Sequence, residues 1–424
     1  MRLNKVQLLY FIKLASSTFM IQGGILFIGM VIGFYIVRQL SVEQYAYYTI
    51  ANTMLGMMTA LSDCGVNTSI LSQGGGVWQD RVKLGKVLST GLEFRKKLSL
   101  LAMTISLPIL ALMLYRNGAD ILTITLVIVV IIPSFNASLT ASIYEIIPKL
   151  HQQLKILQLN QLSVAGGRLI LLGVGLIIFP FTWFALFANG LPRIYGNYKL
   201  KKITKINADI MQPSDQEYAK ETTRIIKRVM PGAIYFAFSG QITLFILSYI
   251  GNVESTAAWG ALGRFAIFFT IFTTVISIVF IPRYARLKES RKEIIKKANQ
   301  IMFLMMMGCA IIIGMVYFFT DVLLFILGTS YENFNSELIL SMINSGIMSL
   351  VGLAWSLSAS RGWVINPVID VCISVIPLVI LVFVIPLNSF YNVLIFNIYC
   401  SLFLLCGHYL MFWYQLFRKT SSNE

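Results

Sequence analysis

Twelve long apolar stretches run through this sequence of 424 residues and decide which environment it can fold in. Apolar side chains make up 57% of the residues and charged ones only 12%, which leaves more apolar surface than a soluble domain can hide. About 20 apolar residues form a helix that crosses the hydrocarbon core of a bilayer. The runs are continuous rather than alternating, which favours helices over a β-barrel. We therefore predict an all-α integral membrane protein of about 12 transmembrane helices. The predicted spans are residues 11–37, 45–64, 98–115, 121–143, 157–179, 181–198, 231–250, 256–281, 299–320, 338–358, 364–386 and 391–414.

The lysines and arginines fall almost entirely on one side of these spans. Of 34 such residues, all but four are assigned to the two termini or to the loops that follow even-numbered spans. Arg95 and Arg193 are among the residues assigned to these loops. Because cytoplasmic loops carry the excess of basic residues, both termini are predicted to be cytoplasmic. The same rule supports the weakest span, 181–198, since without it the basic loop that follows would lie opposite the loop with Lys149 and Lys155. Topology signals and contacts with membrane lipids account for the net charge of +16, so we expect no nucleic-acid partner.

The spans divide into two sets of six across the longest loop, about residues 195–229. A faint internal repeat supports this division, because residues at the start of the second span recur at the start of the eighth. The matched pairs are Val42-Glu43 with Val253-Glu254, Ala46 with Ala257, and Tyr48 with Trp259, all at one constant spacing. Two halves related by an axis along the membrane normal are a recurrent plan of secondary transporters. We predict six-helix bundles at residues 1–208 and 209–424.

Motifs of several enzyme classes are absent from the sequence. No G-x-x-x-x-G-K-[ST] phosphate loop is present, and two histidines, His151 and His408, leave little for a metal site or for histidine-based catalysis. The five cysteines show no C-x-x-C spacing and are typical of small buried residues. The loops predicted to be external are too short to hold the catalytic domain of a membrane glycosyltransferase or polymerase. We expect a protein that is not an enzyme and that binds no metal or cofactor.

Arg168, Arg264 and Asp370 are ionisable residues deep inside predicted spans, where a charge is costly and normally faces a cavity or a partner. Arg168 follows Gly166-Gly167 in the fifth span, and paired glycines permit close helix approach. Arg264 lies in the eighth span and Asp370 in the eleventh. Arginine suits phosphate because it stays protonated and donates two parallel hydrogen bonds. Two deep arginines against one deep carboxylate predict a cavity for an anionic cargo.

Five further polar residues extend this candidate site. Gln22 and Asn52, in the first two spans, line a sugar-binding cavity or make interhelical hydrogen bonds, and the sequence favours neither interpretation. Lys13, Asp63 and Arg361 are secondary candidates at the cytoplasmic mouth of the cavity. For Lys13 and Asp63 we favour a structural role, because residues near the interface can reach water.

The segment that leads into the second span resembles a known family. It reads Leu40-Ser41-Val42-Glu43-Gln44-Tyr45-Ala46-Tyr47-Tyr48, and the span closes with Asp63-Cys64-Gly65. These stretches are similar to the L-[GS]-x-E-x-[YF]-G-x-Y and D-x-G motifs of the Wzx-type polysaccharide (O-antigen unit) flippases of the multidrug/oligosaccharidyl-lipid/polysaccharide (MOP) exporter superfamily. Ala46 replaces the usual glycine. Ile281-Pro282-Arg283-Tyr284, at the end of the eighth span, is similar to the family's proline before a basic loop.

The resemblance implies two six-helix bundles around a V-shaped, alternating-access cavity in the bacterial inner membrane. The cargo would be an undecaprenyl-pyrophosphate-linked oligosaccharide for O-antigen, capsule or exopolysaccharide assembly, its pyrophosphate held by cationic residues. A polysaccharide polymerase and a chain-length regulator are further expected partners. A proton or a sodium gradient would drive the movement, with Asp370 as the best-placed coupling carboxylate. The alternative is a cation-coupled multidrug or small-molecule antiporter of the same superfamily, which predicts a cavity richer in acid than in base.

Overall fold

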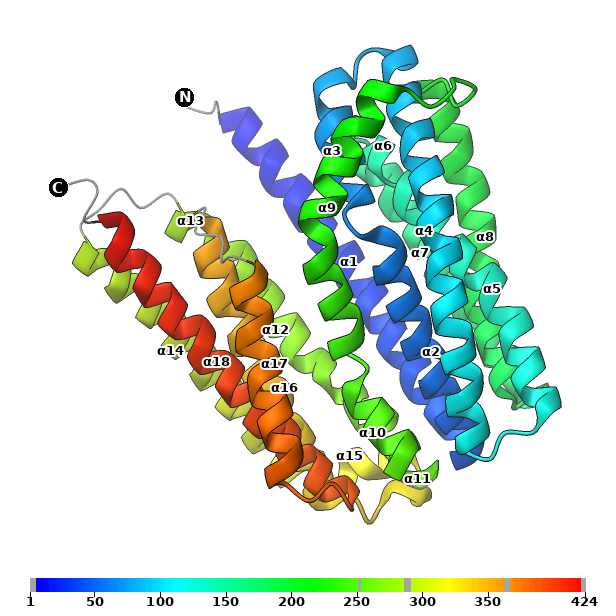
Figure 1. The fold of residues 1–424 in the computed structure, drawn as a ribbon, viewed down its shortest axis with the longest axis vertical. Helices are drawn as coiled ribbons and strands as arrows, with labels where there is room; N and C mark the ends of the chain where they lie inside the picture. Colours follow the sequence, from blue (N-terminus) through cyan, green and yellow to red (C-terminus); the bar gives the residue numbers. More distant parts are fainter. Residues whose placement is uncertain (1–4, 251–252, 286–290, 362–366, 421–424) are drawn as a thin grey trace. The chain divides into compact units, whose positions relative to one another are not determined.

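The computed structural model describes residues 5–250, 253–285, 291–361 and 367–420, and all the regular structure within these ranges is helical (Figure 1). The prediction of an all-α protein is confirmed. The helices pack into two compact units, Met1–Ile242 and Thr243–Glu424, each of them one continuous stretch of chain.

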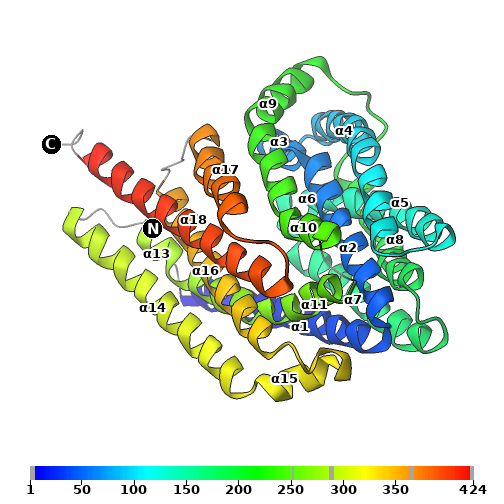
Figure 2. The same ribbon diagram turned by 60° about the horizontal axis from the view of Figure 1, so that its bottom comes forward.

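The first unit begins with the long helix α1 and ends with α9 (Figure 2). Its helices are α1 (Lys5–Gln39), α2 (Val42–Asp63), α3 (Val66–Val77), α4 (Arg81–Arg116), α5 (Ile121–Tyr144), α6 (Ile146–Leu150), α7 (Leu154–Ile178), α8 (Thr182–Asn207) and α9 (Gln216–Ser239).

The second unit begins within α10, which is separated from α9 by the two residues Gly240 and Gln241. Its helices are α10 (Ile242–Ile250), α11 (Val253–Leu262), η1 (Gly263–Ala266), α12 (Ile267–Val279), α13 (Ile281–Ala285), α14 (Arg291–Phe318), α15 (Thr320–Leu327), η2 (Thr329–Tyr331), α16 (Asn335–Ser360), α17 (Pro367–Val384) and α18 (Phe390–Thr420). Helix α16 is central, because α12, α13, α14 and α18 all pack against it.

Each predicted span falls mainly on one of these helices or on consecutive ones, and residues 364–366 of the eleventh span lie outside the described residues. Among the described residues, nine helices or helix runs are long and apolar enough to cross a membrane. Helices α2 and α8, with 22 and 26 residues, have the length but a more polar composition, and α17 has 18 residues. The chain is a multi-pass membrane protein, and its charge-based orientation stays a prediction.

Two arginines that the sequence assigned to loops lie inside helices, so those two assignments are wrong. Arg193 lies within α8, which continues through Pro192 to Asn207. A proline removes one helical hydrogen bond, but membrane helices tolerate it where neighbouring helices compensate; here Pro192 is buried and packs against Gly167 of α7. Arg95 lies in the middle of α4 and is only 4% exposed.

Helix α8 packs closely against α5 and α7 because small residues line the contacts. A side chain at Gly190 would collide with Ser134 of α5, and one at Gly167 would lie 3.2 Å from Cβ of Pro192. The predicted close helix approach beside Arg168 is therefore confirmed at Gly167. At Gly166, by contrast, an added Cβ would meet nothing within 4 Å.

Helix α9 belongs to the first unit because it packs against α2, α3 and α4. Thr222 of α9 lies 2.8 Å from the hydroxyl of Ser69, and Lys86 of α4 lies 3.1 Å from Asp215, the N-cap of α9. The two compact units consequently divide at residues 242/243, later in the chain than the boundary predicted after residue 208.

The internal repeat marks corresponding helix starts in the two units. Helix α2 begins at Val42 and α11 at Val253, and the matched alanines, Ala46 and Ala257, are both fully buried. The span predicted at 256–281 largely coincides with the candidate membrane span Val253–Ser277, within which the 3-10 turn η1 joins α11 to α12. Gly263 opens this turn, and glycine is a poor helix former.

Candidate functional site

Arg168 lies in the interior of the first unit, at the middle of α7. Ten residues separate it from the end of α7, which corresponds to about 15 Å of helix. That is about half the thickness of the hydrocarbon core. Its Nε–H group is buried, and the residues that the structure describes offer it no hydrogen-bond acceptor.

Arg193 on α8 is the charged neighbour of Arg168. It lies about 16 Å along α8 from the short turn that joins α7 to α8, so the two arginines occupy similar depths on adjacent antiparallel helices. The positive charge of Arg193 acts on Arg168, and Arg193 donates a hydrogen bond of 2.7 Å to the hydroxyl of Ser138 on α5. Two guanidinium groups therefore share one region of the bundle interior.

A set of polar side chains surrounds the two arginines. Tyr48 of α2 acts electrostatically on Arg168, and its hydroxyl accepts a hydrogen bond of 3.1 Å from Asn189 of α8. Gln22 of α1 donates to Gln161 of α7 at 3.1 Å. This is an interhelical hydrogen bond, one of the two interpretations that the sequence left open for Gln22, and Gln161 also donates to Glu145 at 3.3 Å.

The carboxylate that acts on this region is Glu145, at the junction of α5 and α6. It attracts Arg193 electrostatically, but it also accepts a hydrogen bond from Gln161 and pairs with Lys149 at 3.1 Å. One carboxylate thus acts on a lysine and an arginine, while the nearby groups that act on Arg168 are the cation Arg193 and the phenol of Tyr48. The local balance is positive, as an anion-binding site requires.

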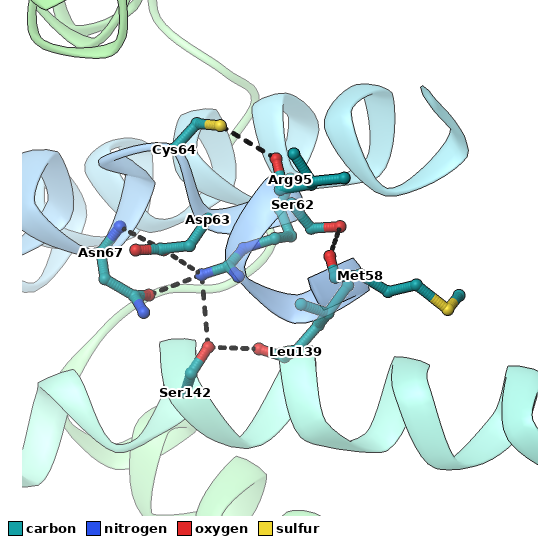
Figure 3. A network of polar contacts seen from close by, with 9 residues as sticks. Met58, Ser62, Asp63, Cys64, Asn67, Arg95, Leu139 and Ser142 are labelled. Atoms are coloured by element: carbon teal, nitrogen blue, oxygen red, sulfur yellow. Dashed lines mark hydrogen bonds and ion pairs between the residues drawn. The ribbon is translucent and has the colours of Figure 1, made fainter. Parts of the chain in front are cut away.

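Asp63 and Arg95 form a buried ion pair between α2 and α4 (Figure 3). One terminal nitrogen of Arg95 lies 2.9 Å from Asp63, 2.6 Å from the amide oxygen of Asn67 and 3.2 Å from the hydroxyl of Ser142. These contacts join α2, α3, α4 and α5. The structural role favoured for Asp63 agrees with this geometry, although its partner is Arg95.

The remaining predicted residues lie apart from this cluster. Asn52 is exposed on α2, and Lys13 lies on α1 with its side chain outside the described residues. In the second unit, Arg264 is half-buried in η1. Arg361 closes α16, where it donates to the backbone oxygen of Tyr284 at 3.2 Å and covers the ring of that tyrosine at 5.5 Å.

Asp370 lies in the described part of α17, and its side chain is 38% exposed. Its partner is His408 of α18, with Nε2 3.2 Å from the carboxylate oxygen Oδ1.

Sequence reasoning missed two residues of these sites, Arg193 and His408. The signal for Arg193 was present, since it falls inside the predicted span 181–198, but it was counted with the basic residues of the loop that follows this span. His408 gave no signal, because its proximity to Asp370 depends on how α17 packs against α18.

Comparisons with known proteins identify the fold. No family model matches the sequence, and no curated protein matches it. A solved inward-facing multidrug resistance MATE family transporter of the MOP superfamily is similar, with a TM-score of 0.72 and 10% identity, covering 93% of this chain and 94% of that one. An outward-facing MATE transporter gives a TM-score of 0.65 at 12% identity, covering 96% and 95%.

A third similar structure is a MOP superfamily transporter from Pyrococcus furiosus, described as having a binding pocket of reverse polarity that suggests a different function. Its TM-score is 0.64 at 11% identity, covering 96% of this chain and 94% of that one. The fold and the apolar helices together define a multi-pass membrane protein with the MATE transporter fold.

Proposed function

We propose that this chain is an alternating-access transporter that moves undecaprenyl-pyrophosphate-linked oligosaccharide units across the bacterial inner membrane, for O-antigen, capsule or exopolysaccharide assembly. The observation that carries the proposal is the pair of guanidinium groups of Arg168 and Arg193 inside the first unit. A polysaccharide polymerase and a chain-length regulator would be the partners of such a transporter.

A diphosphate is the anion that this pair suits. Two like charges close together repel in a low-dielectric interior, and an anion between them removes that repulsion. Guanidinium groups donate paired hydrogen bonds to phosphate oxygens. The buried Nε of Arg168, which has no acceptor among the described residues, supplies a donor for such a ligand.

The fold supports the transport part of the proposal. The similar solved structures are transporters. One of them is described in an inward-facing conformation and another in an outward-facing conformation. One of them is described by a pocket of reverse polarity, so a change of pocket charge within this fold has a precedent.

A cation-coupled multidrug or small-molecule antiporter is the second candidate. It is favoured by the similar structures described as multidrug resistance transporters. A carrier of cationic drugs needs carboxylates in its cavity, whereas the cluster around Arg168 has an excess of base.

The two candidates separate in proteoliposomes that contain the purified protein. Flipping is measured with a fluorescent undecaprenyl-diphosphate-linked sugar, from the fraction protected against a membrane-impermeant quencher. Antiport is measured in parallel by uptake of a cationic dye such as ethidium. We compare the wild type with Arg168→Ala, Arg193→Ala and the matching lysine variants, and use the exposed Lys201→Ala of α8 as the control.

We expect Arg168→Ala and Arg193→Ala each to reduce flipping at least tenfold, with Lys201→Ala unchanged. Lysine should restore part of the rate, because it keeps the charge but loses the paired hydrogen bonds. Normal flipping in both alanine variants would contradict the anion site, and dye uptake without flipping would favour the antiporter.

A further inference from the structure

His408 and Asp370 form a charged contact inside the second unit that the anion site does not use. His408 lies on α18 with a side chain only 7% exposed, and Asp370 lies on α17 with a side chain 38% exposed. Nε2 of the imidazole is 3.2 Å from Oδ1 of the carboxylate. A buried ionisable group in a membrane helix is costly unless it is paired or functional.

The other ring nitrogen fixes the tautomer of this histidine. Nδ1 lies 3.0 Å from the backbone oxygen of Leu404, one turn earlier in α18. A carbonyl oxygen only accepts hydrogen bonds, so Nδ1 must carry a hydrogen. In a neutral imidazole with Nδ1–H, the other nitrogen, Nε2, is a bare lone pair.

Oδ1 of Asp370 needs a donor from the same place. It is buried, and the described side chains and backbone give it no hydrogen bond of good geometry; the imidazole Nε2 is the group within ion-pair distance. If the imidazole were neutral and the carboxylate ionised, two lone pairs would face each other across 3.2 Å. One additional proton between Nε2 and Oδ1 removes this conflict.

We propose that His408 and Asp370 form a proton-binding site, in which one proton is held between Nε2 and Oδ1. With the proton bound, the imidazolium and the carboxylate neutralise each other. When water takes the proton away, a single negative charge and a lone-pair repulsion remain, and the contact between α17 and α18 weakens.

Few other charges bear on this contact. Helix α18 packs against α16 and α17, and the electrostatic partner of His408 is Asp370. The other ionisable groups on the described parts of these three helices, with side chains that the structure covers, are Glu337 in the first turn of α16 and Arg361 at its end, Cys372 of α17, and Tyr391, Tyr399, Cys400, Cys406, Tyr409 and Tyr414 of α18.

The exposed edge of Asp370 gives the proton a route to water, while the imidazole stays enclosed. Such a site would couple a proton gradient, rather than a sodium gradient, to movement of the second unit. That coupling role rests on the proposed transport function. The binding of the proton rests only on the geometry of the pair.

Nitrogen-15 NMR of labelled histidine tests the site directly, because the chain has only two histidines. In the full-length protein with His151→Gln, every histidine signal comes from His408. We expect an imidazolium signal at pH 7 and, at alkaline pH, the neutral form with hydrogen on Nδ1. In Asp370→Asn the imidazolium signal at pH 7 should be lost, because an amide neither carries nor stabilises the proton. Cys372→Ser, an exposed change on the same helix, should leave it unchanged.

Two results would overturn the proposal: a neutral imidazole at pH 7 in the wild-type pair, or an imidazolium signal that survives Asp370→Asn. Gel filtration and circular dichroism of Asp370→Asn show whether the variant is folded, and His408→Gln confirms the assignment of the signal. The spectra need no cargo. A failed flipping assay therefore leaves the proton site standing, and a failed NMR test leaves the anion site standing.

Discussion

Two arginines of the first unit, Arg95, which is buried, and Arg168, which is half-buried, have opposite surroundings. Arg95 has Asp63, Asn67 and Ser142 as acceptors, so its charge is balanced within the fold. Arg168 has a repulsive cationic neighbour and an unsatisfied Nε. The arrangement around Arg95 stabilises the structure, whereas the arrangement around Arg168 costs stability and belongs to the proposed anion site.

Arg95→Ala should lower the free energy of unfolding by about 2–4 kcal/mol, because it leaves Asp63 without its partner and opens a gap among four helices. Arg168→Ala should change it by less than about 1 kcal/mol or raise it, since a repelled charge is removed. Denaturant unfolding in detergent measures both. Lys96→Ala, an exposed neighbour of Arg95, is the control, and equal losses for the two arginines would contradict this contrast.

The junction between α2 and α3 explains one motif of the sequence in structural terms. Cys64 and Gly65 both have left-handed backbones, with φ of 37° and 94°, and Asp63 accepts a hydrogen bond from the backbone nitrogen of Asn67. Gly65 packs against Val229 of α9. The D-x-G stretch thus bends the chain between α2 and α3 and holds the Arg95 ion pair, a role that the sequence alone did not reveal.

Gly65→Ala should destabilise the protein by about 1–3 kcal/mol, because alanine is strained at this φ and its Cβ would lie 3.1 Å from that of Val229. Gly75→Ala is a matched control in the middle of α3, where an added Cβ meets nothing within 4 Å; it should stabilise by about 0.5–1 kcal/mol. Thermal unfolding compares the two, and a harmless Gly65→Ala would contradict the role of the left-handed turn.

At the scale of elements, polar contacts fasten the start of α9 to α4. The side chain of Asp215 caps α9 by accepting a hydrogen bond from the backbone nitrogen of Glu217, and it also accepts one from the ammonium group of Lys86. Its own backbone nitrogen donates to the hydroxyl of Thr90. The hydrogen bond from Lys86 and that from the backbone nitrogen of Glu217 lower the pKa of the Asp215 carboxyl. The clamp is therefore strongest with the carboxylate ionised.

Because the pKa is lowered in the folded state, the clamp contributes stability above the ordinary pKa range of aspartate and loses it as the pH falls through the lowered value. Asp215→Asn should remove this pH dependence and increase proteolysis of the segment 208–215 at pH 7. Limited proteolysis across pH 3–7 measures it. Glu221→Gln, at an exposed pair with Arg224, serves as the control and should behave as the wild type.

The positions of the helices could be predicted from hydropathy, because lipid requires long apolar runs with internally paired backbones. The break at η1 could not, since the apolar pattern continues through Phe265 into α12. The candidate site could be predicted in part: Arg168 stood out as a charge inside a span. Its relation to Arg193 depends on the packing of α7 against α8, which one sequence does not encode as a readable pattern.

At the scale of the whole molecule, the distribution of basic residues predicts which side each loop faces. In a background with the native cysteines replaced, Lys202→Cys should react with a membrane-impermeant maleimide only in inside-out vesicles. Asn388→Cys, exposed between α17 and α18, should react only in intact cells. The positive-inside rule is the physical reason, and labelling of Lys202→Cys from outside would contradict the orientation.

Each compact unit is one uninterrupted stretch of chain, divided at residues 242/243. During synthesis, all nine helices of the first unit have therefore left the ribosome before the last helices of the second are made. The Arg95 ion pair and the Arg168–Arg193 region can assemble in the membrane without any residue of α11–α18. The residues of the proposed anion site therefore lie in the part of the chain that is synthesised first, and the His408–Asp370 contact lies in the part that is synthesised last.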